Sequence, residues 1–299
     1  MPNSIIAKSI LNKAKRRGRD SWFLDDYTIN AYSGCSFNCL YCYIRGSKYG
    51  EHMEEKASMK SNAVELLDKQ LAARARKKEY GFIVMSSATD PYLHFEEREK
   101  LTRRMLEVVL KHRFPVHVIT KSELVTRDFD LFHEINKNAI LPPDLEQHMK
   151  DRVIVTFSFS TVDDNIGHIF EPGAPAPSLR LKTMQKASEN GFLTGVSMMP
   201  LIPYISDTKE SLANMFSAFK THGAEYIMPS TITLFGEGKG DSKTLVKRAV
   251  GKHFPHLLPK YEKFFSSSTG VPPQYFQAFN QKMREMSKAY SISLRIVNF

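Results

Sequence analysis

The chain has 299 residues, 42% of them apolar, which is enough material for one large core or for a domain with an appendage. No apolar run approaches the roughly 20 residues of a membrane-spanning helix, so we expect no membrane association. The formal net charge of +10 favours polyanionic partners such as nucleic acid, although a generally basic surface or a pocket for a small anion would give the same balance.

The N-terminal extension, 1–26, is basic and lacks the apolar segment of a secretory signal. A basic transit segment is the alternative, and a cytoplasmic location is the default expectation. The chain has three cysteines, and this odd number argues against a disulfide framework. Their crowding within eight residues fits a reducing compartment.

Six short β-rich runs alternate with helical patterns along the chain. The runs predict strands at 26–33, 81–87, 115–120, 152–160, 192–199 and 224–231. Amphipathic patterns predict helices at 96–112, 128–137, 178–190 and 207–222, the last two ending at Gly191 and Gly223. Alternating strands and helices predict an α/β fold with a parallel sheet. The pattern leaves open whether the sheet is doubly wound or forms a barrel or partial barrel.

Polar motifs follow the carboxyl ends of the predicted strands, where both architectures place their chemistry. We therefore expect these motifs to share one cavity. They are the cysteines, 86–91, 120–122, 158–161 and 199–200. Beyond 233 the chain turns basic and aromatic, and we predict a mostly helical C-terminal appendage, 234–299, on a core of 27–233. Its expected elements are helices at 243–252, 257–265 and 273–289 and a last strand at 292–299.

Cys35, Cys39 and Cys42 form a C-x3-C-x2-C cluster. One interpretation is a structural zinc with a histidine such as His52 or His94 as fourth ligand, although zinc sites usually combine two spaced pairs. The other is a [4Fe-4S] cluster, in which three thiolates would leave one iron open for a cofactor or substrate. The spacing favours the iron–sulfur cluster.

The cysteine motif resembles the signature of the radical S-adenosylmethionine superfamily, and companion motifs between about 27 and 203 resemble its spore-photoproduct-lyase-like branch. These motifs are Tyr32-Ser-Gly-Cys35, Cys39-Leu-Tyr-Cys42-Tyr43, Thr89-Asp-Pro-Tyr92, Leu101-Thr-Arg103, Thr120-Lys-Ser122, Arg127-Asp128, Phe170-Glu-Pro-Gly-Ala-Pro175 and Arg180-Leu181.

The resemblance implies a partial (β/α)6 barrel of the TIM type and a radical enzyme. A [4Fe-4S] cluster on Cys35, Cys39 and Cys42 would reductively cleave S-adenosylmethionine to a 5′-deoxyadenosyl radical. An external one-electron reductant such as a flavodoxin or ferredoxin would be required. The substrate is unassigned, the reaction is lyase-like or transferase-like, and nucleic-acid repair or modification is a candidate. The alternative is a zinc-stabilised basic nucleic-acid-binding module without radical chemistry.

The resemblance also implies roles for single residues, each with core packing or an ordinary surface position as its alternative. Tyr43 would lie against the adenine of the cofactor, and the backbone at Met199 would run along it. Lys121 would pair with the cofactor carboxylate. Thr89 and either Ser158 or Ser160 would supply hydroxyl contacts. Tyr41 matches a tyrosine implicated in radical transfer.

Two further residues, Glu171 and Arg180, recur together in this branch, and we expect them to form a buried or half-buried ion pair.

One position departs from the resemblance. The lyase carries a fourth cysteine that returns a hydrogen atom to the product radical, and the matching position here is about Ser87. A hydroxyl O–H bond is too strong to replace a thiol in that step. A tyrosine such as Tyr41 or Tyr92 is the alternative donor. The sequence therefore predicts radical generation but not the complete lyase reaction.

Overall fold

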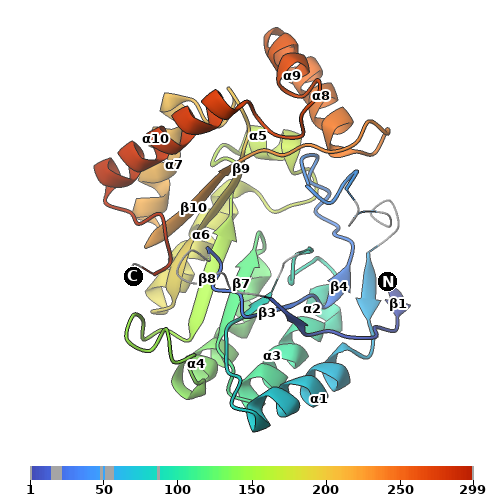
Figure 1. Ribbon diagram of the computed structural model, residues 1–299, viewed down its shortest axis with the longest axis vertical. Coiled ribbons are helices and arrows are strands. Elements are labelled where there is room, and N and C mark those ends of the chain that lie inside the picture. Colours follow the sequence, from blue (N-terminus) through green and yellow to red (C-terminus); the bar gives the residue numbers. More distant parts are fainter. Residues whose placement is uncertain (1, 15–21, 48–49, 51–56, 86–87, 298–299) are drawn as a thin grey trace.

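The computed structural model describes residues 2–14, 22–47, 50, 57–85 and 88–297 (Figure 1). These residues form two sheets. The larger sheet contains β2 (Asn12–Lys13), β3 (Tyr27–Ile29), β6 (Ile83–Met85), β7 (Val116–Thr120), β8 (Val153–Ser158), β9 (Leu193–Leu201) and β10 (Tyr226–Thr231). The smaller sheet contains β1 (Asn3–Ile5), β5 (Ser58–Lys60) and β4 (Tyr32–Ser33).

The strand order of the larger sheet decides between the two architectures that the sequence left open. The sheet runs β10-β9-β8-β7-β6-β3-β2. From β3 to β10, neighbouring strands therefore follow one another in the sequence, apart from β4 and β5, which belong to the smaller sheet. All of these pairs are parallel, and only β2 is antiparallel. A doubly wound sheet would reverse its order at a switch point. Because the described residues do not pair β10 with β3, the barrel is partial, as predicted.

A layer of helices covers the outer face of the sheet (Figure 1). Helix 96–112 is interrupted at Lys100, whose φ of 48° is left-handed, and so forms α2 (Glu96–Glu99) and α3 (Leu101–Lys111). The other members of this layer are α1 (Ala63–Arg76), α4 (Phe129–Asn138), α6 (Pro177–Glu189) and α7 (Lys209–Thr221). The prediction did not specify α1. A 3-10 turn, η2 (Glu123–Asp128), precedes α4, and the short α5 (Asp164–Phe170) precedes α6.

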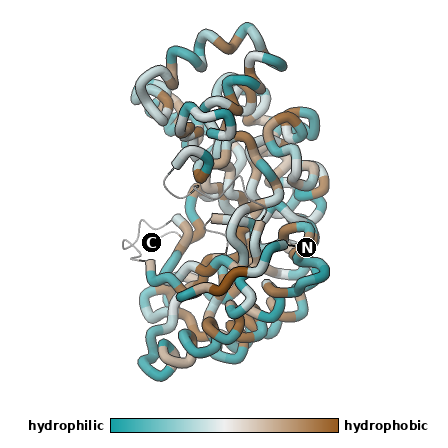
Figure 2. Tube along the Cα trace, turned by 90° about the vertical axis from the view of Figure 1, so that its right-hand side faces the viewer, coloured by the Kyte–Doolittle hydropathy of each residue, from teal (hydrophilic) through white to brown (hydrophobic). Residues whose placement is uncertain are grey.

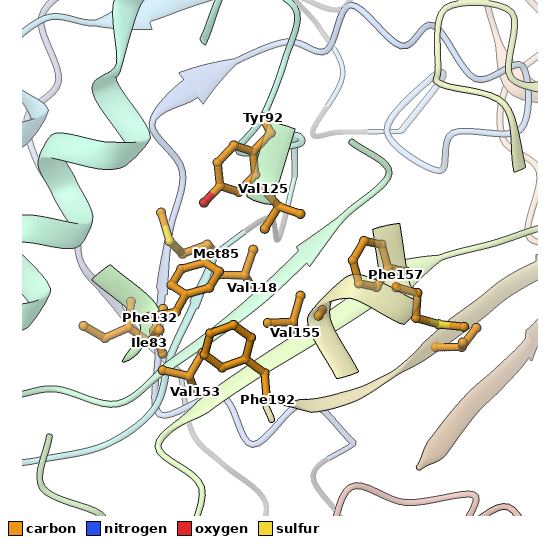
Figure 3. Packing of buried hydrophobic residues seen from close by; sticks show 14 of the residues in the cluster. Ile83, Met85, Tyr92, Val118, Val125, Phe132, Val153, Val155, Phe157 and Phe192 are labelled. Atoms are coloured by element: carbon orange, nitrogen blue, oxygen red, sulfur yellow. The ribbon is translucent and has the colours of Figure 1, made fainter. Parts of the chain in front are cut away.

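The outer face of the sheet is apolar because its strands alternate. Residues of β6, β7 and β8 that point outward pack against the helices in the main core. Figure 3 shows Ile83, Val118, Val153 and Val155 from these strands in one layer with Phe132 of α4. All five side chains are fully buried. Packing against the helices therefore stabilises the sheet through its outer face, and the inner face remains for the site.

The inner face is filled toward the amino ends of the strands by residues that we call the inner plug. His117 is fully buried there, and its Nδ1–H donates to the carbonyl of Phe23 at 2.9 Å. Its Nε2 therefore accepts from the Thr156 hydroxyl at 2.5 Å, and Thr156 accepts from the Tyr226 hydroxyl at 2.5 Å. The plug comprises Phe82, His117, Leu141, Leu145, Ile154, Thr156, Tyr226 and Met228.

The C-terminal region is helical, as predicted. It contains α8 (Ser242–His253), the short η3 (Pro255–Leu257), α9 (Leu258–Phe264) and α10 (Pro273–Tyr290). Figure 1 shows α8 and α9 at one end of the molecule, whereas α10 lies beside α7. In Figure 2 hydrophilic and hydrophobic stretches alternate along the helices at that end, as expected for helices with one buried side.

The last predicted strand, 292–299, is wrong over the residues that the structure describes. There Ser293 makes only an isolated bridge to Tyr226, because the chain after α10 passes the amino end of β10 without running along it. The first predicted strand, 26–33, divides into β3 and β4, which lie in different sheets. The boundaries at 26/27 and 233/234 stay predictions. Residues of the N-terminal extension join both sheets through β1 and β2.

Candidate functional site

A cavity of about 530 Å³ opens above the inner plug, at the carboxyl ends of the parallel strands. Its walls contain the cysteine loop and the ends of β7, β8, β9 and β10. Nine of the ten residues predicted to form the site line it, namely Cys35, Cys39, Tyr41, Cys42, Tyr43, Thr89, Lys121, Ser158 and Met199. Of the predicted site residues, Ser160 alone is outside the lining.

The cysteine loop follows β4 and is shaped by two residues with left-handed backbone. Gly34 has a φ of 78° and Asn38 a φ of 53°, conformations that glycine and asparagine tolerate best. The three cysteines are free thiols and half-buried. Burial raises the pKa of Cys35 to about 11, and it also raises the pKa of Cys39. Because burial disfavours the charged thiolate, these cysteines would need a bound cationic group to remain deprotonated.

The segment 170–175 holds this loop from behind. The backbone N–H of Gly173 donates to the carbonyl of Phe37 at 3.0 Å, and that of Leu40 donates to the carbonyl of Phe170 at 2.9 Å. A Cβ at Gly173 would lie 2.5 Å from the carbonyl oxygen of Ser36, so only glycine permits the approach. The two backbone segments are therefore locked together.

Glu171 gathers a buried network at the same place. Its Oε1 accepts from the hydroxyl of Tyr41 and from Ser160 at 2.7 Å, and its Oε2 accepts from Arg180. Burial alone would raise the pKa of Glu171, but the charges of Arg180 and Lys121 bring it down to about 2. Glu171 is therefore ionised, and the expected Glu171–Arg180 ion pair is present with both side chains buried.

Arg180 extends this network to the strand ends. Its Nη1 donates to the carbonyl of Ser158 at 2.9 Å, and its Nε donates to the carbonyl of Pro175 at 2.9 Å. The guanidinium also lies over the ring of Phe159, 5.6 Å from its centroid. One buried ion pair thus connects the cysteine loop, segment 170–175 and the end of β8.

Lys121 and Ser158 meet at the cavity wall. The Nζ of Lys121 donates to the Ser158 hydroxyl at 2.6 Å. The position of Lys121 is fixed by buried Asp90, which accepts from its backbone N–H at 2.8 Å and from the Thr120 hydroxyl at 2.7 Å. Burial raises the pKa of Asp90, whereas these hydrogen bonds oppose the rise. Asp90 therefore acts as a brace between the ends of β6 and β7.

The remaining predicted residues occupy different depths. The Thr89 hydroxyl donates to the carbonyl of Gly34 at 2.6 Å, which ties it to the cysteine loop. Tyr43 is 48% exposed at the cavity wall, so its ring is open to a ligand. Ser160 is fully buried behind the wall and committed to Glu171. The structure therefore places Ser158, and not Ser160, at the cavity.

Arg45 is a structural element of the site that the sequence prediction missed. Its Nε donates to the carbonyl of Cys39 at 3.2 Å, its Nη1 to that of Gly240 at 3.2 Å, and its Nη2 to the side chain of Asn38. The Ser242 hydroxyl in turn donates to the carbonyl of Arg45. These contacts fix the cysteine loop to the C-terminal region. No sequence signal identifies the contacts with the C-terminal region, because Gly240 and Ser242 are 195 and 197 residues away from Arg45.

The motif residues Arg103, Arg127 and Asp128 lie in a second buried network. Arg127 pairs with Glu96 and Asp128, each at 2.8 Å, and Arg103 pairs with Asp128 at 3.0 Å. The Tyr92 hydroxyl donates to Asp128 at 3.1 Å. None of these residues lines the cavity. Their role in the described structure is to brace the loops beneath the site.

The donor set fits an iron–sulfur cluster, because soft thiolates are the ligands that such clusters take and all three thiols lie in one loop at the cavity. Among the described side chains, no three His, Cys, Asp or Glu residues are grouped to hold one metal ion. The buried Ser36 hydroxyl beside Cys35 has no hydrogen-bond partner in the described structure.

His94 is used elsewhere, since its Nε2 bonds the carbonyl of Gly173 at 2.9 Å. Two other positions, His52 and Ser87, lie outside the described residues. A lipid bilayer could not be crossed by any helix in the described part of the chain, because none combines the necessary length with the necessary apolar character.

Comparison with known proteins places this cavity in a family context. The model of a family described as the Radical SAM superfamily matches residues 29–216. An uncharacterised protein of Mycobacterium tuberculosis is 23% identical over 297 residues, covering 97% of this chain and 81% of its own length. An uncharacterised protein of Acidianus two-tailed virus is 27% identical over 278 residues, covering 86% of this chain and 87% of its own.

The fold also has a solved counterpart. A spore photoproduct lyase variant with bound AdoMet and dinucleoside spore photoproduct superposes with a TM-score of 0.64 at 14% identity, covering 96% of this chain and 78% of that chain. At this identity the likeness shows the fold alone.

Proposed function

The chain belongs to the radical SAM superfamily, and we propose that it is an enzyme that uses the cavity above the inner plug to generate a radical and direct it at a substrate. The cofactors are those of the superfamily, a [4Fe-4S] cluster and S-adenosylmethionine. The observation that carries the proposal is that three cysteines from one loop and a lysine–serine pair from two strand ends line the same cavity.

Cys35, Cys39 and Cys42 would bind the cluster, leaving one iron for S-adenosylmethionine. When bound, the two cofactors supply a 5′-deoxyadenosyl radical by reductive cleavage of the sulfonium. The chain orients them. Arg45 holds the carbonyl of Cys39, and Tyr41 ties the loop to Glu171, so the thiols keep their places in the wall.

The cofactor contacts follow from the wall residues. Lys121 would pair with the carboxylate of S-adenosylmethionine, since its ammonium is directed at the Ser158 hydroxyl and both lie in the wall. Tyr43 and the backbone at Met199 would flank the adenine. Thr89 would help to position the cysteine loop through its hydrogen bond to Gly34, and Ser160 would support the site through its hydrogen bond to Glu171. The radical-transfer role of Tyr41 stays a prediction, and any such relay would start from a hydroxyl bonded to Glu171.

The source of the hydrogen atom that quenches the product radical distinguishes this chain from the lyase. All three cysteines belong to the motif, so no thiol is left to return a hydrogen atom. The hydroxyls of Tyr41 and Tyr92 both donate to buried carboxylates. We therefore propose that the product radical is quenched from outside the chain or ends in a different product. The choice between lyase-like and transferase-like chemistry follows from that fate.

Anaerobic reconstitution with iron and sulfide tests the proposal. We expect about four irons and four sulfides per chain, an electron paramagnetic resonance signal that changes when S-adenosylmethionine is added, and 5′-deoxyadenosine after reduction with dithionite. Cys39→Ala should lose all three, whereas Ser36→Ala should keep them. One zinc without iron would replace the proposal with the zinc-binding module, and a cluster signal that ignores S-adenosylmethionine would also sink it.

Nucleic-acid repair or modification is a narrower candidate. Its support is the net charge of +10 and the fold shared with a lyase whose structure holds a dinucleoside spore photoproduct. A binding titration of single- and double-stranded DNA against salt tests it, because phosphate contacts make affinity fall steeply as salt rises. Absence of binding at low salt would exclude this substrate class.

A further inference from the structure

The positive charge of the chain is concentrated near the cysteine loop. Residues 234–299 contain eleven Lys or Arg and four Asp or Glu, so seven of the ten net positive charges lie there. Between 239 and 263 seven basic residues stand against two acidic ones. Figure 1 shows the helices of this segment, α8 and α9, at one end of the molecule. Five of these basic residues are exposed, and we call them the basic face: Lys239 in the loop before α8, Arg248 and Lys252 on α8, and Lys260 and Lys263 on α9.

The start of α8 is joined to the cysteine loop. Val246 and Val250 of α8 belong to the same apolar cluster as Tyr41, and Cys39 and Leu40 are partly buried against that cluster. Arg45 donates to the carbonyl of Cys39 and to that of Gly240 in the loop leading into α8, and the Ser242 hydroxyl donates to the carbonyl of Arg45. One side chain therefore connects the cysteine loop with the start of α8.

The two sides of the cysteine loop therefore have different neighbours. The three cysteines and Tyr41 line the cavity, whereas Leu40 is outside its lining and packs against the apolar cluster that contains Val246 and Val250 of α8. A molecule in the cavity and a molecule on the outer side of α8 would approach the same cysteines from different directions. The cluster could be reached from the basic face without displacing what the cavity holds.

We propose that the basic face is the docking surface for an acidic one-electron carrier protein that reduces the cluster. The inference rests on the proposed function, because the cluster must gain one electron for each cleavage and the carrier loses one. No further cysteines exist to ligate a second cluster inside the chain. Charge complementarity steers such short-lived redox encounters, which bury little surface.

The position of the basic face favours a carrier protein over nucleic acid. A nucleic-acid substrate must present its reacting atom inside the cavity. Binding on the outer side of α8 would hold it behind the cysteine loop, with a helix in between. Electron transfer needs no contact between reacting atoms, so a carrier bound beside α8 would not have to enter the cavity.

A charge-reversal pair tests the proposal. Arg248→Glu/Lys252→Glu changes two exposed residues one helical turn apart. The matched control is Arg76→Glu/Lys77→Glu, at the end of α1 that leads into β6 and thus at the opposite end of the strands. S-adenosylmethionine cleavage is measured with reduced flavodoxin and, separately, with dithionite. Binding of flavodoxin is measured on the same proteins by fluorescence titration.

We expect the α8 pair to raise the KM for flavodoxin and the Kd for its binding by at least about tenfold at low ionic strength, with the difference shrinking as salt is added. Dithionite-driven cleavage should stay at the wild-type rate, and the α1 pair should match wild type in both assays. This contrast separates docking from damage to the site.

Equal flavodoxin binding by wild type and the α8 pair would overturn the inference. Loss of DNA binding by the α8 pair, with flavodoxin unaffected, would also overturn it and assign the basic face to nucleic acid. If wild type forms no 5′-deoxyadenosine even with dithionite, the proposed function fails. The flavodoxin titration then decides the docking inference on its own.

Discussion

The inner face of the sheet has two parts that the same six strands build in opposite ways. Toward the amino ends it is closed by the inner plug, with His117, Thr156 and Tyr226 in one hydrogen-bonded chain. Toward the carboxyl ends it is open and lined by thiols, hydroxyls and Lys121. Both parts contain buried polar groups, and within the described residues the upper part holds the cavity.

The difference lies in how each polar group is satisfied. In the plug, each polar group of the hydrogen-bonded series has a partner within the plug or its covering segment, and apolar side chains fill the remaining space. In the cavity Glu171 lies behind the wall and Asp90 within it, and they hold Tyr41 and the backbone of Lys121, two residues of the lining. A site thus requires polar groups fixed from one side only. Each of the following changes tests one half of this contrast.

Loss of the Glu171 charge should have the largest effect on stability. Glu171→Gln leaves Arg180 buried without a counter-charge, and we expect the free energy of unfolding to fall by about 3–5 kcal/mol. Asp130→Asn, which breaks the more exposed pair with Arg103, should cost under about 1 kcal/mol. Urea denaturation of both variants measures the difference. Similar losses would show that the buried pair is not a special brace.

The inner plug should make stability depend on pH through His117. Burial lowers the pKa of His117 to about 4, with the nearby Asp25 charge opposing the change. The unfolded chain takes up this proton below about pH 6.5 while the folded chain refuses it, so the stabilisation is complete above that pH and disappears toward pH 4. The loss is on the order of 3 kcal/mol.

Unfolding curves between pH 7 and pH 4.5 check this. The loss of stability over that range should shrink in His117→Gln and persist in His133→Gln, whose ring is exposed. Glu171, with a pKa of about 2, changes the free energy of unfolding only below this range, because its stabilisation is lost as the pH falls from about 4.5 to about 2. An unchanged slope in His117→Gln would mean that another group controls this range.

Lys121→Met tests the open half of the contrast. If Lys121 pairs with the carboxylate of S-adenosylmethionine, its removal should weaken cofactor binding by about 10–100-fold, because a hydrogen bond to a charged group is worth about 1.5–3 kcal/mol. Cluster content and unfolding free energy should hardly change. Lys111→Met, at the exposed end of α3, should bind as wild type does. Undiminished affinity would leave the Lys121–Ser158 pair as a purely structural contact.

The sequence predicted the six parallel strands because alternation and turn residues are local signals. It also predicted which strand ends carry polar residues, and the structure brings most of these into one cavity. The choice between Ser158 and Ser160 could not be made in advance. Residues two apart on a strand share a side, but β8 ends at Ser158, and the chain beyond it turns Ser160 back to Glu171.

Features that depend on distant partners were the ones that sequence did not reveal. The apolar run at 292–297 resembles a strand, yet whether it pairs depends on where α10 ends relative to β10. The contacts of Arg45 depend on a loop about 200 residues away. The filling of the inner plug likewise depends on which side chains meet across three strands.

Gly195→Ala tests that filling, with the smallest expected effect. Gly195 lies between Thr156 and Tyr226 in the pairing of β8, β9 and β10, and the Tyr226 ring crosses it to reach Thr156. An added Cβ would stand 2.4 Å from that ring, so Tyr226 must move and the plug must repack. We expect a net cost of about 1–2 kcal/mol, since overpacking outweighs the small entropic gain from alanine.

Gly270→Ala is the control, because an added Cβ there meets nothing within 4 Å. Combining Gly195→Ala with Tyr226→Leu separates the clash from other causes. If the ring is what alanine strikes, Gly195→Ala should cost less in the Tyr226→Leu background than in wild type, a coupling that a double-mutant cycle in urea measures. Additive costs would mean that the glycine serves the backbone of β9 and not the ring. The closed half of the inner face would then owe its shape to the strands themselves.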